Sequence, residues 1–180
     1  MSRIVIAVAS FVALTVSLPG TMIGQAASPD ARFPCRNVHT FDFWAGTFDN
    51  VPWNKPNDPS RGTLVNTRDY EGCVFIERWT GANASGNGMS MVFYDTVKKT
   101  WRMIWNDDSN SSTVFDEGTF HDSSMRFLGW VLAPNGNRVM ASNELQDVSP
   151  GVIRHIFSTS PDSGKTWIVR SDGRFVRRKE

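Results

Sequence analysis

The chain has 180 residues, 40% of them hydrophobic, with 19 Lys and Arg against 18 Asp and Glu, which gives a formal net charge of +1. A near-neutral chain offers no electrostatic basis for binding nucleic acid or an anionic membrane, so neither partner is expected. The length suits a single domain that can bury a substantial core.

The first 27 residues predict a secretory signal peptide. Arg3 supplies a positive start, residues 4–18 form an apolar run, and Gly24–Ala27 offers small residues for cleavage. The apolar run is shorter than the ~20 residues that span a bilayer, although an uncleaved N-terminal anchor is the alternative. We therefore expect an exported protein, periplasmic or secreted, with no membrane span after cleavage.

An irregular, proline-containing extension is expected over residues 28–40, with one helical turn around residues 38–45. The next segment, Phe41–Phe48, holds four aromatic side chains within eight positions. Such a segment can plug one end of a small barrel, with Gly46 where the backbone must pass closely. We expect it to form both the first strand and the end plug of one domain over residues 41–180.

The two cysteines, Cys35 and Cys73, both lie in the part expected to be exported. An oxidising compartment favours their pairing, so we predict a Cys35–Cys73 disulfide that ties the extension to a barrel strand. Two separate thiols are the alternative. Two cysteines do not make a zinc site, which needs three or four ligands, and the three histidines lie far apart in the sequence. No metal or cofactor is expected.

Beyond residue 40 the sequence shows short segments with two-residue alternation or continuous apolar character, separated by turn residues, and no helical period. Asn135-Gly136 is a strong hairpin signal, because both residues tolerate the positive φ of a type I′ turn. About nine or ten strands without helical crossovers indicate an all-β fold, either an antiparallel up-and-down barrel or a sandwich. The strands expected after residue 60 are 63–69, 73–79, 89–94, 101–106, 114–120, 124–132, 138–145, 152–159, 166–170 and 174–177.

Residues 160–167 match the S-x-D-x-G-x-x-W pattern of an Asp-box hairpin. In this turn the Asp162 carboxylate accepts backbone N–H bonds, Gly164 takes a positive φ, and Trp167 packs beneath. Sialidase propellers repeat such boxes, whereas this chain has one and is too short for six blades. The motif therefore indicates a stabilised turn and not a sialidase.

Four segments stand out when taken in order: Phe41–Gly46, Gly72–Trp79, Ser90–Asp95 with Trp101–Asp107, and Arg154–Trp167. Together they resemble a family of bacterial, mostly exported, lipocalin-like (calycin-type) domains without an assigned function. The resemblance covers nearly all of residues 40–178. It implies a β-barrel with a small internal cavity and implies no particular reaction.

Glu77 is the most informative polar position on the predicted inner faces. A carboxyl among apolar neighbours must be paired, hydrogen-bonded or neutral when it is buried. An ion pair with an arginine such as Arg154, or hydrogen bonds from indole N–H groups, would satisfy it structurally. Alternatively, it anchors a ligand or acts as an acid or base with a raised pKa. Strand alternation gives the expected ligand-binding set as Glu77, Trp79, Tyr94, Trp101, Met103 and Trp105.

The leading hypothesis is an exported barrel that binds a small, largely apolar molecule. The first alternative is a hydrolase, isomerase or lyase that uses Glu77 and His155 as general acid and base in the same cavity. A further alternative is a haem-type barrel in which His155 or His121 ligates iron, and a fourth is a structural envelope protein. The sequence leaves the oligomeric state open.

Overall fold

The computed structural model of the chain describes Cys35 and residues 39–109, 111–133 and 135–179. The expected signal peptide lies outside the described residues, as do positions 28–34 and 36–38 of the expected extension. Within the described part, no helix has the length and apolar character needed to cross a membrane.

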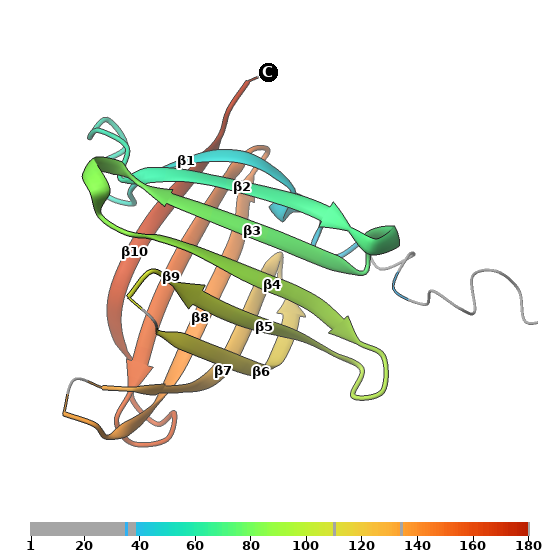
Figure 1. Cartoon of the computed structure of the whole chain (residues 1–180), viewed down its shortest axis with the longest axis vertical. Coiled ribbons are helices and arrows are strands. Elements are labelled where there is room, and N and C mark those ends of the chain that lie inside the picture. Colours follow the sequence, from blue (N-terminus) through green and yellow to red (C-terminus); the bar gives the residue numbers. More distant parts are fainter. Residues whose placement is uncertain (1–34, 36–38, 110, 134, 180) are drawn as a thin grey trace, which may run out of the picture.

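Ten strands are described, each antiparallel to the next along the chain, and β1 pairs with β10 to close a single barrel (Figure 1). This confirms the predicted all-β, up-and-down barrel and excludes the sandwich. The helical residues in the described part of the chain all belong to short 3-10 helices. The strands are β1 (Gly46–Pro52), β2 (Gly62–Asp69), β3 (Val74–Gly81), β4 (Asn87–Asp95), β5 (Thr100–Asp107), β6 (Ser112–His121), β7 (Ser124–Leu132), β8 (Arg138–Ser149), β9 (Val152–Ser160) and β10 (Ile168–Arg177).

Alternation along the strands separates the inside of the barrel from the outside. In β4, Ser90 and Val92 are fully buried. Met89, which has the opposite phase, is exposed. Because successive side chains of a strand point to opposite faces, one residue in two fills the interior. The predicted inward phase of β4 is therefore the phase that the structure shows.

One end of the barrel is closed by an aromatic plug. The chain enters through the 3-10 helix η2 (Asp42–Trp44), and β1 begins at Gly46, so the expected first strand starts later than Phe41. Phe41 is fully buried, and its ring centroid lies 5.1 Å from that of Phe75, 5.6 Å from Trp101 and 5.9 Å from Phe127. These rings come from segments far apart in the sequence, and their burial joins those segments at this end.

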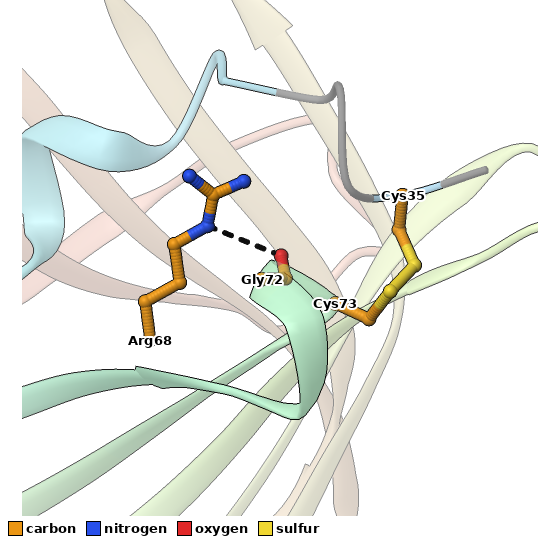
Figure 2. Close-up of a disulfide and its surroundings, with 4 residues drawn as sticks. All are labelled: Cys35, Arg68, Gly72 and Cys73. Carbon is orange, nitrogen blue, oxygen red and sulfur yellow. Dashed lines mark hydrogen bonds between the residues drawn. A yellow bond between two sulfur atoms is a disulfide. The ribbon is translucent and has the colours of Figure 1, made fainter. Parts of the chain in front are cut away.

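The plug is fastened to the barrel wall at several points. Cys35 and Cys73 form the predicted disulfide, with their Cα atoms 5.0 Å apart, beside the 3-10 helix η3 (Tyr70–Gly72) (Figure 2). Arg68 Nε donates to the Gly72 carbonyl oxygen at 3.2 Å and so holds the turn that carries Cys73 (Figure 2). On the other side, the Arg177 guanidinium donates to the Phe43 and Ala45 carbonyl oxygens.

Two turns were predicted from sequence motifs, and the structure agrees with the prediction at residues 160–167 and differs from it at residues 135–136. Asp162 accepts hydrogen bonds from Thr166 N (2.8 Å) and Thr166 Oγ1 (2.7 Å), and Gly164 has φ +90°, as the Asp-box motif predicts. The two-residue type I′ turn at Asn135-Gly136 is wrong, because β7 ends at Leu132, β8 begins at Arg138, and Gly136 N donates to the Ala133 carbonyl oxygen at 2.8 Å. The loop is wider than two residues, and Ala133 and Asn137 close it through a 2.8 Å backbone hydrogen bond.

Candidate ligand-binding cavity

A cavity of about 1370 Å³ occupies the half of the barrel away from the plug. It opens between the loops that connect β5 to β6, β7 to β8 and β9 to β10. Aromatic and aliphatic side chains make most of its wall, and a few buried or half-buried polar groups interrupt it. Those inner polar groups are Asn50, Glu77, Asn143 and His155.

The structure divides the predicted ligand-binding residues between the two ends of the barrel. Trp101 is buried against the plug, and Tyr94 packs on it with ring centroids 5.5 Å apart, so neither lines the cavity. Both side chains have the expected inward orientation, but they lie at the plugged end of the barrel and not beside the cavity. The predicted residues that do line the cavity are Glu77, Trp79, Met103, Trp105 and His155.

Two glycines make room for the rings of Trp79 and Trp105 at the cavity wall. A Cβ atom at Gly62 would come within 2.5 Å of the Trp79 ring, and one at Gly88 would overlap the Trp105 ring. With hydrogen in place of a methyl group, each indole rests on the backbone of a neighbouring strand. A larger residue at Gly62 or Gly88 would therefore displace a ring that lines the cavity.

Glu77 lies on β3 at the inner part of the cavity and is 8% exposed. Ser90 Oγ on β4 donates to Glu77 Oε2 at 2.9 Å. The predicted ion pair with Arg154 is wrong, because Arg154 binds Asp172 through a two-point contact (3.0 and 2.7 Å). Burial raises the pKa of Glu77 to about 7, against the lowering effects of Ser90 and Trp44.

Trp44 brings an indole N–H to the carboxyl of Glu77. This side chain is 2% exposed, and Asn66 Nδ2 holds its backbone in place by donating to the Trp44 carbonyl oxygen at 2.7 Å. The N–H lies near enough to lower the pKa of Glu77, yet it makes no hydrogen bond of normal geometry. A buried donor in this condition carries a desolvation cost that a suitable acceptor would remove.

His155 lies on β9 and belongs to a separate polar group. Its Nε2 is 2.5 Å from Asn143 Oδ1, and Asn143 Nδ2 is 3.2 Å from Met103 Sδ. An amide oxygen can accept a hydrogen bond but not donate one, so Nε2 carries the ring proton. Burial lowers the pKa of His155 to about 4, with Asp172 opposing that shift, so the imidazole is neutral at neutral pH.

Glu77 and His155 are not hydrogen-bonded to each other. Three strands, β10, β1 and β2, separate β9 from β3 around the barrel, and the two side chains bind different partners. The Phe175 ring lies 5.6 Å from the His155 ring and 6.3 Å from the Trp79 ring, measured between centroids. The Phe175 side chain therefore packs against both the His155 ring and the Trp79 ring.

Positive charge lines the mouth of the cavity and not its depth. Arg138 lies over the Trp130 ring at 5.2 Å, and Arg170 Nε donates to Thr159 Oγ1 at 2.8 Å. Both arginines are exposed. Asp107 also lies at the mouth, where hydrogen bonds from Ser109 and other neighbours lower its pKa.

The sequence alone did not point to three cavity residues, Trp44, Asn143 and Phe175. Trp44 was expected to be a packed residue of the plug, but its indole reaches the inner end of the cavity. Asn143 follows buried Ala141 and precedes buried Leu145 in the same phase of β8. A polar residue in an apolar inward phase was the available signal for it.

Other chemistries find little support among the described residues. No group of three or more His, Cys, Asp or Glu side chains lies close enough together to hold a metal ion there. His121 is the last residue of β6, with its side chain 85% exposed and its Nδ1 at 2.7 Å from Asp122. No protein-family model matches the chain, and no curated protein matches it significantly.

Proposed function

We propose that this barrel binds a small, largely apolar molecule in its cavity. The observation that carries the proposal is the open volume of about 1370 Å³, which exceeds the usual range of about 300–1,000 Å³ for ligand sites. Protein interiors are normally packed to crystal-like density, so an open aromatic-lined space is costly unless a ligand fills it. An apolar ligand would gain free energy in proportion to the area that it removes from water.

The wall residues suggest how such a molecule is held. The flat faces of Trp79 and Trp105 offer contact area at little cost in side-chain entropy, and flexible Met103 can adapt to the shape of the ligand. The carboxyl of Glu77 and the N–H of Trp44 can orient one polar group of the ligand. We place the binding function before the enzyme alternative because Glu77 and His155 are not hydrogen-bonded to each other.

We also propose export, as the signal-like start predicts, and membership of the lipocalin-like family. The Cys35–Cys73 disulfide supports export because such bonds persist in oxidising compartments. The ten-stranded antiparallel barrel supports the family resemblance at the level of the fold.

The test uses a neutral fluorescent probe, N-phenyl-1-naphthylamine, and its displacement by 1-decanol. Wild-type protein should show saturable probe binding that decanol reverses, and Trp79→Ala should weaken both by about tenfold, as expected for loss of an aromatic contact. Trp167→Ala is the matched control, because this ring lies outside the cavity beneath Arg126, at 4.9 Å. Absence of saturable binding, or equal loss in both variants, would contradict the proposal.

A further inference from the structure

Glu77 is unusual among the acids of this protein because it is buried without a cation. Among the described residues it is the one acidic side chain in the buried class, and no Lys, Arg or His there lies within ion-pair distance of it. The exposed or half-buried acids Asp49 and Asp172 each bind an arginine. A glutamine would make the same neutral contacts without the cost of burying an ionisable group, so the carboxyl has no evident structural purpose.

Burial favours the neutral form of Glu77, but the hydrogen-bonding groups beside it are donors that suit a carboxylate. Ser90 Oγ already donates to it, and the unpartnered N–H of Trp44 lies beside it as a second donor. The groups that face it from β2, β4 and η2 are Asn66, Ser90 and Trp44, and none carries a charge. The site thus supplies hydrogen-bond donors for a negative charge and lacks a positive charge to balance it.

Three packed aromatic rings line the same cavity as Glu77. Trp44 and Phe175 pack edge to face with centroids 5.3 Å apart, and Trp79 packs on Phe175 at 6.3 Å. All three line the cavity together with Glu77. The negative face of an aromatic ring attracts cations, and aromatic cages are used to bind ammonium groups.

Resting on the proposed function, we infer that the ligand of this cavity carries a positively charged amine, which pairs with Glu77 between Trp44, Trp79 and Phe175. An apolar body attached to the amine fills the remaining space between Trp105, Met103 and the mouth. Anionic amphiphiles are disfavoured in this orientation because the cations Arg138 and Arg170 lie at the exposed mouth and none faces Glu77.

Three probes of equal chain length distinguish the inference from the proposed function: decylamine, 1-decanol and decanoate, each displacing N-phenyl-1-naphthylamine at pH 7.5. Wild-type protein should bind decylamine at least about tenfold more tightly than decanol, and it should bind decanoate most weakly. A factor of this size is expected for a desolvated cation–aromatic contact together with a charged hydrogen bond. Glu77→Gln should remove the preference, so that decylamine and decanol bind this variant within about threefold of each other.

Glu117→Gln is the matched control, because it makes the same charge change at an exposed position on β6 that does not line the cavity. It should leave the ranking of the three probes unchanged. The inference is overturned if decanol binds as tightly as decylamine, or if the preference survives in Glu77→Gln, and in both cases saturable decanol binding would leave the proposed function standing. Failure of all three probes, together with absence of dye binding, would overturn both.

Discussion

Replacing Glu77 by Gln should make the free energy of unfolding fall as the pH falls from 6.5 to 4.5, whereas in the wild-type protein it should stay nearly constant. The pKa of Glu77 is raised from 4.5 to about 7 by burial, so the native state keeps a proton that the unfolded chain loses. Its stabilising contribution is complete below pH 4.5 and is lost as the pH rises toward 7. At about 1.4 kcal/mol per pKa unit, the change in the free energy of unfolding is about 3 kcal/mol.

His155 has the opposite effect over nearly the same range. Burial lowers its pKa from 6.5 to about 4, so the native state releases a proton that the unfolded chain holds. Its contribution is complete above pH 6.5 and is lost as the pH falls toward 4, again by about 3 kcal/mol. Between pH 4.5 and 6.5 the two slopes oppose each other, and the wild-type stability should be nearly constant.

The assay is urea unfolding followed by tryptophan fluorescence at pH 4.5, 5.5, 6.5 and 7.5, with the disulfide intact. Glu77→Gln should lose about 3 kcal/mol from pH 6.5 to 4.5, whereas His155→Gln should lose a similar amount as the pH rises over that range. The double variant should again be nearly flat. Single variants whose profiles run parallel to wild type within about 0.5 kcal/mol would refute the assignment of these protons.

Two further changes test the plug and its attachment. Phe41→Ala empties the centre of the closed end and should lower the free energy of unfolding by about 3–5 kcal/mol in the same urea assay, and a loss below about 1 kcal/mol would contradict the plug as a core element. Replacing Cys35 and Cys73 by serine should cost up to about 4 kcal/mol on the loop-entropy model while the far-UV circular dichroism stays that of a barrel, and an unchanged urea midpoint would show that the bond adds no stability.

Strand alternation predicted which way side chains face but not how deep they lie. Trp101 and Trp105 share one phase of β5, and both point into the barrel, yet Trp101 contacts the plug and Trp105 lines the cavity. Depth depends on where η2 inserts, which is a tertiary contact with no signature in the periodicity of β5. The expected ligand-binding set therefore mixes residues of the two ends.

The local sequence pattern did not predict the extent of the last strand, β10. Residues 166–170 and 174–177 were expected as separate strands, whereas β10 runs without interruption from Ile168 to Arg177. The register between β10 and β9 shifts between Val169 and Ser171, and such an irregularity reverses the phase of alternation partway along a strand. The partner strands β1 and β9 keep β10 continuous through pairing that the sequence pattern does not contain.

The seam between β1 and β10 has a consequence for how this chain reaches its native state. It joins residues from opposite ends of the sequence, and Asp49 and Arg178, which bind across it, are 129 residues apart. Neighbouring hairpins can form early, but closing so long a loop costs entropy that is recovered at the final step, so folding should be slow. A chain still lacking β10 has two open sheet edges exposed to other chains, and aggregation is therefore most probable just before the barrel closes.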